Sequence, residues 1–516
     1  MAKTNTRPKA VTRTVTHEGA PAYKADVFNE LLLTGASTFF GEGTFYESAD
    51  ERSKRFIALV HEATKRDAGR TAKIISDLRT RYKIRTASIV AAVEYQRAGG
   101  RNARAVIDSV LQRPDEPAEA LAYFMANYGR SLPWALKRGV ADAATRLYNE
   151  RGVIKYGRND NAAVSMADVI ELTHPTPKAD WQNALFRYIL DEAHNHDGAQ
   201  RLQGKGYGLK LLEKNIFLMG LPAEDRRPVL DDGYQVLAEA GITWEALSGW
   251  LGGPVDAKAW EAVIPEMGVM ALIRNLRNFD KAGISSLAQA IVEAKITSAE
   301  DVERSRIFPY RAYTAYREAP SDRWKYPLGT TVELAAGNIP SWDRTLFLVD
   351  VSGSMTGVLS TRGTVQRLEV AAVMAAAAVK HSTDSDVVLF STKNKALPPN
   401  PGESVLRHAR RIASYNGDPT DRRGFGWSSD PLGHGTLGYT AIEEHFDPAK
   451  HDRIVIFTDD QMHDSPGPKA TACKQIVFFN LAGYAPHSDW GKGRIHIGGF
   501  SDAAFSLAAD LTDLQR

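Results

Sequence analysis

The stretch FLVDVSGSMTG, residues 347–357, places one carboxylate and two hydroxyls at alternate positions directly after a run of apolar residues. Asp350 would end a buried strand, and Ser352 and Ser354 would follow it in the turn. Ligands of a parallel sheet collect outside the carboxyl ends of its strands, so these oxygens would converge there. An incomplete set of hard oxygen ligands suits Mg²⁺ or a similar divalent cation that keeps some of its waters. The pattern predicts a cation site; the plainer alternative is a strand-end turn that caps a helix.

Two later segments could supply the remaining ligands of such a site. Asp459 in IVIFTDDQMH would end another apolar strand, and Thr436 in GHGTLGYTAI precedes a predicted helix. Thr440, one turn further along, is the rival of Thr436. The residues alone leave this choice open, as they do the choice among Mg²⁺, Mn²⁺ and Ca²⁺.

The elements that must position these residues are typical of an α/β sheet. Continuous apolar runs alternate with predicted helices, which favours a doubly wound parallel sheet covered on both faces. The predicted strands are residues 345–352, 386–392, 453–460, 474–481 and 494–500. The long stretch 393–435 reads as irregular and would change access to the cation site.

The preceding part of the chain has a different period. From about residue 24 to 325, apolar residues recur at three- and four-residue spacing, without a fixed-period repeat, which predicts stacked helices of a HEAT-like solenoid. Residues 326–343 are rich in Gly, Pro and Thr and read as a junction. We therefore predict a multidomain chain: a mobile basic arm (1–23), an all-α helical-repeat domain (24–330) and an α/β doubly wound, Rossmann-like domain (331–516).

The charge of the chain is uneven although its net value is only +2. Residues 52–104 hold 14 Lys and Arg against four Asp and Glu, a net of +10. Such an excess is either the footprint of a polyanion or an ordinary solvated helix surface. The N-terminus lacks the apolar core of a secretory signal and no apolar run has membrane length, so we expect a cytoplasmic protein without membrane contact. The single cysteine, Cys473, would be a buried inert thiol.

The cation-site residues resemble a known family. DVSGS, a later Gly-Thr that enters a helix and an apolar strand that ends in Thr-Asp resemble the metal-ion-dependent adhesion site of von Willebrand factor A domains. The Ala-Ile pair at 441–442 falls where such domains carry Ala-Leu if Thr436 is the ligand. The resemblance implies that a partner's carboxylate completes the coordination. The ligands it implies are Asp350, Ser352, Ser354, Thr436 and Asp459.

The helical part and the domain order resemble the Ro (TROVE-domain) RNA-binding proteins. The segments that carry this resemblance are WEAVIPEMGVMALIRNLRNF (260–279) and FNELLLTGASTFFGEGTFY (28–46). In that family the helical repeats close into a ring, Y RNAs bind its outer surface, and single-stranded ends of misfolded small RNAs enter the central hole. In bacterial members a Y RNA tethers the ring to an exoribonuclease, polynucleotide phosphorylase. The resemblance implies the same partners here.

The same resemblance nominates three residues for RNA contact. The family's Lys-Tyr-x-x-Arg segment followed by Leu-Ser-His is similar to KYGRNDNAAVSMADVIELTH, in which Leu-Thr-His replaces the usual triplet. It implies RNA contacts for Lys155, Arg158 and His174. Lysine and arginine would neutralise phosphates, and the histidine could stack or hydrogen-bond on an unpaired base. For His174 the alternative is a histidine that only ends a helix.

Other functions are less well supported by the residues. DDQMHDS after the strand that ends at Asp459 could hold two metals for phosphodiester cleavage, but its acids come from one loop and read equally well as a solvated turn. No nucleophile–base pair or phosphate-cradling glycine loop stands out. We therefore expect a monomeric, non-catalytic RNA-binding scaffold. The alternative is a metal-dependent protein-interaction module with the helices as a passive scaffold.

Overall fold

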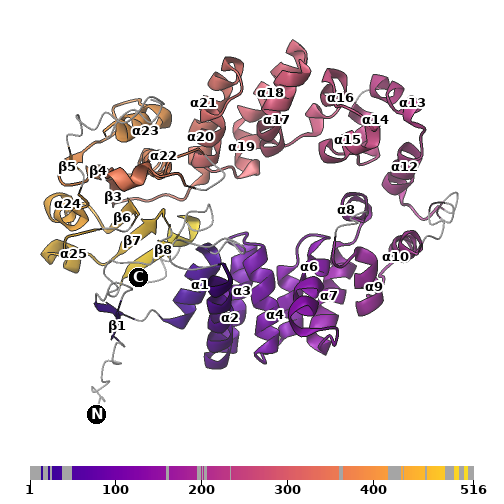
Figure 1. Cartoon of the computed structure of the whole chain (residues 1–516), viewed down its shortest axis with the longest axis horizontal. Helices are drawn as coiled ribbons and strands as arrows, with labels where there is room; N and C mark the ends of the chain where they lie inside the picture. The colour runs from indigo at the N-terminus through magenta and orange to yellow at the C-terminus, as the bar shows by residue number, and fades with distance from the viewer. Residues whose placement is uncertain are drawn as a thin grey trace. The chain divides into compact units, whose positions relative to one another are not determined.

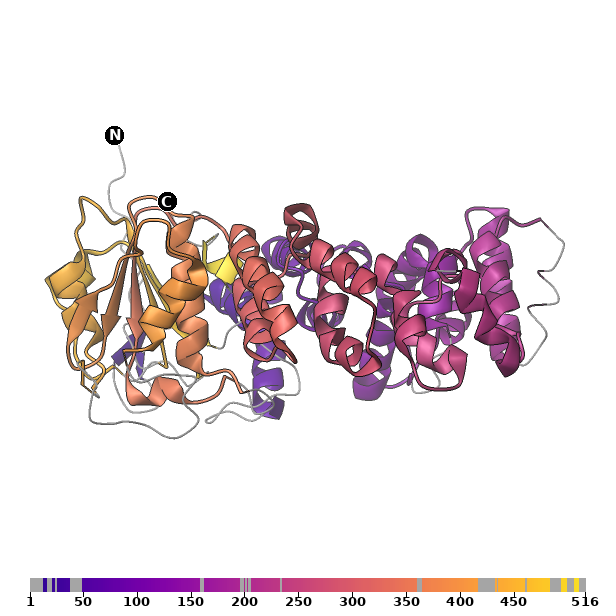
Figure 2. The same cartoon turned by 90° about the horizontal axis from the view of Figure 1, so that it is seen from above.

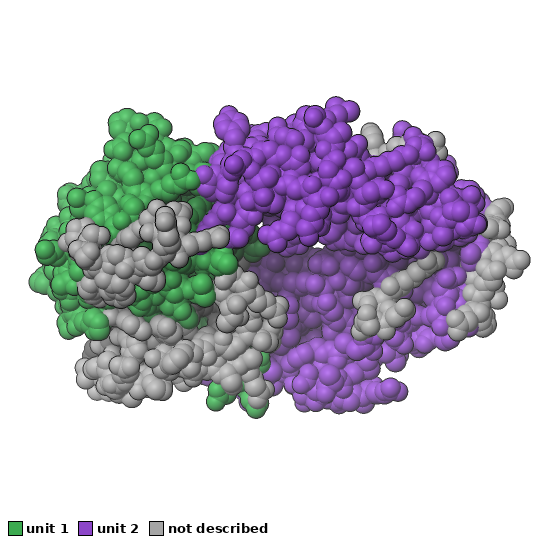
Figure 3. Space-filling view, turned by 45° about the horizontal axis from the view of Figure 1, so that its top comes forward, with its two compact units in different colours: residues 1–56, 307–314, 332–516 green, residues 57–306, 315–331 purple. Residues whose placement is uncertain are grey.

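The computed structural model describes most of the chain (Figure 1). The described residues are 13–15, 21–23, 26–37, 49–157, 162–194, 199, 202, 206–232, 234–359, 364–415, 432–433, 435–459, 462–482, 493–498 and 505–509. The chain divides into two compact units that alternate along the sequence (Figure 3). Unit 1 comprises residues 1–56, 307–314 and 332–516, and unit 2 comprises residues 57–306 and 315–331.

Unit 2 is helical throughout its described residues, as the spacing of apolar side chains predicted. Short polar side chains satisfy the free N–H groups of several first turns: Asp67 caps α3, and Ser165 forms a capping box with Asp168 on α9. Two of the helices, α2 and α21, begin or end in unit 1. The helices are α2 (Ala49–Arg66), α3 (Ala68–Thr80), α4 (Thr86–Arg97), α5 (Ala103–Val110), α6 (Glu116–Tyr128), α7 (Trp134–Leu147), α8 (Glu150–Tyr156), α9 (Met166–Thr173), α10 (Asp180–Ala193), α12 (Lys210–Met219), α13 (Ala223–Arg226), α14 (Tyr234–Glu239), α15 (Trp244–Leu251), α16 (Ala257–Glu261), α17 (Val269–Ala282), α18 (Ser286–Ile296), α19 (Ala299–Ser305) and α21 (Lys325–Ala335).

Large aromatic side chains fill the core of the second half of unit 2. Trp260 and Phe279 meet edge to face with ring centroids 5.1 Å apart. The indole N–H of Trp250 donates to the Leu218 carbonyl at 2.8 Å, and that of Trp324 donates to Asp280 at 2.9 Å. The buried indoles of Trp250 and Trp324 therefore each have a hydrogen-bond acceptor, as burial of a polar N–H favours.

The segment that we read as a junction is largely helical. α21 runs through Pro327 although its sequence, KYPLGTTVELA, is rich in breakers. Proline is tolerated there because it lies in the first turn, where its missing N–H has no helical acceptor. The Thr331 hydroxyl bonds to the carbonyls of Pro327 and Ile296, at 3.0 and 2.7 Å. Burial against α18 therefore overrides the weak helix propensity of this segment.

Unit 1 holds a six-stranded sheet in the order β5-β4-β3-β6-β7-β8. All neighbouring strands are parallel except β5, which pairs with β4 in the antiparallel direction at the edge. The predicted strands are all present, and β5 is an addition within the stretch that we read as irregular. The strands are β3 (Thr345–Asp350), β4 (Asp386–Phe390), β5 (Asn394–Ala396), β6 (Arg453–Thr458), β7 (Ile476–Asn480) and β8 (Arg494–Gly498).

Helices cover both faces of this sheet (Figure 2). On one face, Leu346 and Leu348 of β3 pack with Tyr439 and Ile442 of α24 (Gly438–His445). The other face lies against α22 (Arg367–Lys380), whose described side chains from Leu368 to Val379 are all buried. α23 (Val405–Ala413) packs on α22, and α25 (Pro468–Ala472) packs on α24. A helix that is apolar all round must be enclosed, and here a helix and a sheet enclose α22.

Two segments distant in sequence complete unit 1. α1 (Val27–Ser37) contacts β8, the last strand of the sheet. The Tyr313 hydroxyl, on α20 (Pro309–Arg317), donates to the buried carboxylate of Glu369 on α22 at 2.9 Å. Within the predicted N-terminal arm, β1 (Arg13–Val15) and β2 (Pro21–Tyr23) pair in the antiparallel direction. No described helix has the length and hydropathy that a membrane crossing requires.

Candidate metal centre and RNA-contact residues

The sheet topology brings two carboxylates to one point. The chain leaves β3 for β4 on one side and later returns to β6 on the other side of β3. The carboxyl ends of β3 and β6 therefore form a topological switch point, where open α/β sheets bind ligands. Asp350 is the last residue of β3, and Asp459 directly follows β6. Both side chains are fully buried.

The first of these carboxylates is held in place by its neighbours. The Ser352 backbone N–H donates to Asp350 Oδ1 at 2.9 Å, and the Thr458 hydroxyl donates to Oδ2 at 2.7 Å. The turn after Asp350 is a 3₁₀ turn, Gly353–Thr356, which brings the hydroxyl oxygens of Ser352 and Ser354 within 3.2 Å of each other. The structure thus brings together the carboxylate and two hydroxyls that the alternate spacing predicted, with Ser352 buried and Ser354 exposed.

The Thr436 loop reaches the same edge of the sheet. The Ser391 hydroxyl, just after β4, donates to the carbonyls of Gly433 and Gly435 at 2.6 and 2.8 Å. The backbone N–H of His463, in the loop after β6, donates to the Thr436 carbonyl at 3.0 Å. These bonds tie the Thr436 segment to the ends of two strands, and its side chain is buried.

The rival threonine has a different partner. Both the backbone N–H and the hydroxyl of Thr440 donate to Asp464 Oδ2, at 2.7 and 3.0 Å. Thr440 is also exposed, one turn along α24, whereas Thr436 precedes the helix and is buried. This geometry favours Thr436 as the ligand.

The site holds two buried carboxylates whose charge a cation would balance. Neither carboxylate oxygen of Asp459 has a hydrogen-bond partner among the described residues, although the side chain is fully buried. Burial and, to a lesser extent, the Asp459 carboxylate raise the pKa of Asp350 to about 7, against the opposing hydrogen bonds from Ser352 and Thr458. Two buried carboxylates, of which Asp459 has both oxygens unused, lie beside two hydroxyls, and this set fits a hard divalent cation such as Mg²⁺.

This raised pKa predicts pH-dependent cation binding. A cation and a proton compete for the Asp350 carboxylate, so binding should weaken progressively as the pH falls below about 7 and level off above it. The stability of the metal-free protein depends on pH in the opposite direction. Between about pH 4 and 7 the folded site holds a proton that the unfolded chain has lost. The metal-free unit should therefore lose stability as the pH rises through this window. Calorimetric titration with Mg²⁺ from pH 5.5 to 8 checks the first statement; an affinity independent of pH would contradict it.

The acidic loop after β6, which was weighed as a nuclease site, lies only partly within the described residues. Asp460 lies outside the described residues. Asp464 accepts two hydrogen bonds from Thr440, and His463 contributes its backbone to the Thr436 segment. Among the described residues there is no cluster of three or more His, Cys, Asp or Glu side chains that could hold a metal.

The three residues nominated for RNA contact have unequal surroundings. Lys155, the penultimate residue of α8, is 44% exposed and pairs with Glu245 at 2.9 Å. His174 ends α9 in the left-handed conformation, with φ 49° and ψ 62°, and its side chain is exposed. Arg158 lies outside the described residues. No described contact joins Lys155 to His174.

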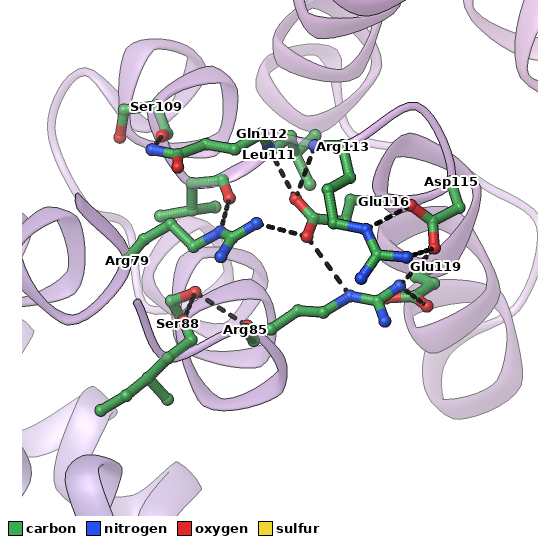
Figure 4. Close-up of polar contacts among 12 residues, drawn as sticks. Arg79, Arg85, Ser88, Ser109, Leu111, Gln112, Arg113, Asp115, Glu116 and Glu119 are labelled. Atoms are coloured by element: carbon green, nitrogen blue, oxygen red, sulfur yellow. Dashed lines mark hydrogen bonds and ion pairs between the residues drawn. The ribbon is translucent and has the colours of Figure 1, made fainter. Parts of the chain in front are cut away.

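Carboxylates within unit 2 neutralise part of the excess positive charge of residues 52–104. Figure 4 shows Arg79 and Arg85 directed at the carboxylate of Glu116. The Arg79 guanidinium, 8% exposed, also donates to the Val110 carbonyl at 2.9 Å, and Arg85 bonds to Asp115 at 2.6 Å. Glu116 itself is fully buried and accepts the backbone N–H of Arg113 at 3.1 Å. These two arginines therefore stabilise the packing of α3, α4 and α6 and are not available to a ligand.

A second layer of the same network lies nearer the surface. Arg113 donates to both oxygens of Asp115 at 3.1 and 2.9 Å, and to the Tyr156 hydroxyl at 3.0 Å. Burial lowers the pKa of Arg113, but the nearby Asp115 carboxylate raises it, and the net pKa of Arg113 lies above its ordinary value. The hydroxyl of Tyr156 is thus occupied. Sequence reasoning missed this network, because charge counts do not reveal which cations face inward.

Comparisons with known proteins agree with this architecture. Residues 235–321 match the family model of the TROVE domain. The crystal structure of the Deinococcus radiodurans Ro (RSR) protein matches 95% of this chain and 100% of that chain, with a TM-score of 0.69 and 19% identity. The chain therefore has a Ro-type fold, and its residues 235–321 are similar to the TROVE domain. None of the curated proteins compared with the chain matches it.

The Ro-type fold confirms the predicted fold class, helical repeats followed by an α/β domain. The segment 260–279, on which the resemblance partly rested, lies inside the TROVE match. Lys155, Arg158 and His174 lie outside it, so their role stays a prediction. Of the segment 28–46, residues 28–37 are described and belong to α1.

Proposed function

We propose that this protein of Ro-type fold is a non-catalytic RNA-binding scaffold. The observation that carries the proposal is the TROVE match together with a Ro-type fold over 95% of the chain. The net charge of +10 over residues 52–104 supports it, because cations that neutralise phosphates supply affinity that does not depend on sequence. The helical part would bind a small structured RNA of the Y type on its outer surface. Single-stranded ends of misfolded RNAs would enter the hole of a ring.

The proposal includes a partner and an assembly state. The bound Y-type RNA would present substrates to an exoribonuclease such as polynucleotide phosphorylase, in the cytoplasm. One chain would close the ring, so the protein would be a monomer. A mass measurement in solution tests this part independently of RNA, and a stable dimer would contradict it.

The test of RNA binding is to recover the protein from its native cells and sequence the RNA that accompanies it. We expect one abundant small RNA with a long stem, lost progressively as the salt concentration is raised. Absence of RNA at low salt would contradict the proposal and leave residues 52–104 as a solvated surface.

Replacing Lys155 and Arg158 together by Ala should weaken binding of the structured RNA. Each cation that contacts a phosphate contributes roughly one unit to the slope of log affinity against log salt, so the slope should fall by about 1–2. Equilibrium binding at several salt concentrations measures it. Lys214→Ala is the matched control, because Lys214 is an exposed lysine of unit 2 that also pairs with a glutamate, Glu239. An unchanged slope in the double variant would contradict the assignment.

We also propose a function for the α/β unit: the capture of an acidic partner through a divalent cation. The observation that favours it is the buried Asp459, whose two oxygens have no partner among the described residues. Asp350, Ser352, Ser354, Thr436 and Asp459 would hold the ion. Bound there, the ion would supply a Lewis-acid position for a carboxylate of the partner. Asp350→Ala should abolish stabilisation by Mg²⁺ and leave RNA binding nearly intact.

A further inference from the structure

Two interhelical turns of unit 2 lie side by side. One joins α4 to α5 and the other joins α6 to α7, and each helix of the first pair contacts one of the second. The Arg97 guanidinium, at the end of α4, lies 3.7 Å from the ring centroid of Tyr128 at the end of α6. The Arg104 guanidinium, at the start of α5, lies 5.9 Å from the ring of Trp134 at the start of α7. Two cation–π contacts therefore link these turns, which we call the paired turns.

An exposed tryptophan is the main feature of the paired turns. Trp134 is 68% exposed, unlike the buried tryptophans 250, 260, 324 and 342. It is the first residue of α7, so Lys137 and Arg138 follow at the three- and four-residue spacing that places side chains on one face of a helix. An aromatic ring left open to solvent between cations is the arrangement on which unpaired bases stack.

Internal hydrogen bonds hold Arg104 and Tyr128 of the paired turns in place. The Arg104 guanidinium donates twice to the Asp142 carboxylate, at 2.6 and 2.9 Å, which fixes its position at the Trp134 ring. The Tyr128 hydroxyl donates at 2.6 Å to the fully buried Glu94. Such anchoring reduces the conformational entropy that a ligand must overcome on binding.

Cations without carboxylate partners gather at the same turns. Within the described part of the chain, five cationic side chains here make no ion pair: Arg97, Arg101, Arg130, Lys137 and Arg138. Other arginines of unit 2 are occupied by carboxylates, as Arg79 and Arg85 are by Glu116. Much of the positive charge that remains available in this part of the chain therefore lies around Trp134.

We propose that the paired turns are a stacking platform for the unpaired bases of single-stranded RNA. One base stacks on Trp134, and the surrounding cations contact the phosphates on either side of it. This inference rests on the proposed RNA-binding function and names the part of the helical unit that distinguishes single strands. In a duplex each base is already stacked on the adjacent bases, so a duplex would make only the phosphate contacts with the protein.

The test is the affinity of the full-length protein for a labelled single-stranded RNA of roughly twelve nucleotides, within the site sizes of stacking proteins. Trp134→Ala should weaken this binding about ten- to a hundredfold, and Trp134→Phe should retain most of it. A blunt duplex RNA of the same length should bind the wild type and Trp134→Ala within about twofold. Phe217→Ala is the matched control, because Phe217 is also an aromatic residue of unit 2 that is 68% exposed.

The outcomes separate this inference from the function on which it rests. If the wild type binds neither RNA, both fail. If the wild type binds single strands and Trp134→Ala binds them equally well, only the platform is wrong. Equal losses for single strand and duplex would also overturn it, since stacking on an open base would not be the cause. Circular dichroism of each variant excludes misfolding, and full rescue by phenylalanine supports an aromatic contact.

Discussion

Replacing Asp459 by Asn should stabilise the metal-free protein and abolish its stabilisation by Mg²⁺. Asp459 is fully buried, and both of its carboxylate oxygens lack hydrogen-bond partners among the described residues. Removing such a charge should raise the free energy of unfolding of unit 1 by about 1–3 kcal/mol at neutral pH in the presence of a chelator. Saturating Mg²⁺ should stabilise the wild type by about 2.7 kcal/mol at a hundred times its dissociation constant, and the variant not at all.

Chemical denaturation with and without Mg²⁺ measures both effects. Asp464→Asn is the control, because Asp464 lies in the same loop but accepts its bonds from Thr440. It should leave the Mg²⁺ effect unchanged. If Asp459→Asn instead destabilised the metal-free protein, the carboxylate would serve a structural role that does not involve an ion. A Mg²⁺ effect that persisted in the variant would place the cation elsewhere.

Replacing Glu116 by Ala should destabilise unit 2 by about 3–5 kcal/mol, because it leaves a buried guanidinium without its counter-charge. Arg79 is only 8% exposed, and it would lose the Glu116 carboxylate that Figure 4 shows beside it. The backbone N–H of Gln112 would lose its acceptor as well, at 2.6 Å in the native protein. Thermal or chemical unfolding of the full chain measures the loss.

Two further variants make this result specific. Glu62→Ala removes a pair in which Arg66 and Glu62 are 54% and 40% exposed, and it should cost at most about 1 kcal/mol. The double variant Arg79→Met, Glu116→Leu should be more stable than Glu116→Ala, because no unpaired charge remains in the interior. A double variant less stable than the single one would show that the pair contributes more than the avoidance of a buried charge.

The strands and their ends could be predicted because buried parallel strands give a strong local signal. Each is a continuous apolar run, and β3 stops at Asp350 and β6 just before Asp459. The strand β5 gave no such signal, since its three residues, Asn394–Ala396, are polar or exposed and pair only at the edge. α21 was missed for the opposite reason: tertiary burial makes a helix of a segment whose composition indicates a turn.

The residues of the candidate site could be predicted more completely than the hydrogen bonds around them. The sequence alone shows the alternate spacing of Asp350, Ser352 and Ser354 and the order of the loops. The engagement of Thr440 by Asp464 and the absence of partners for Asp459 depend on which loops meet in space. The same limit applies to the basic region, where a charge count cannot separate Arg79, which is buried, from Arg97, which is exposed.

The contact between α1 and β8 has a consequence for the synthesis of the chain on the ribosome. α1 ends at Ser37 and β8 begins at Arg494, so the 456 residues 38–493 must be translated between them. At about 5–20 residues per second, this takes roughly 20–90 s. During that time the strand that completes unit 1 has not been synthesised. The apolar side chains of Leu31 and Leu32, which are buried in the folded protein, therefore lack part of their native surroundings. The nascent chain therefore offers chaperones a hydrophobic segment whose native partner emerges several hundred residues later.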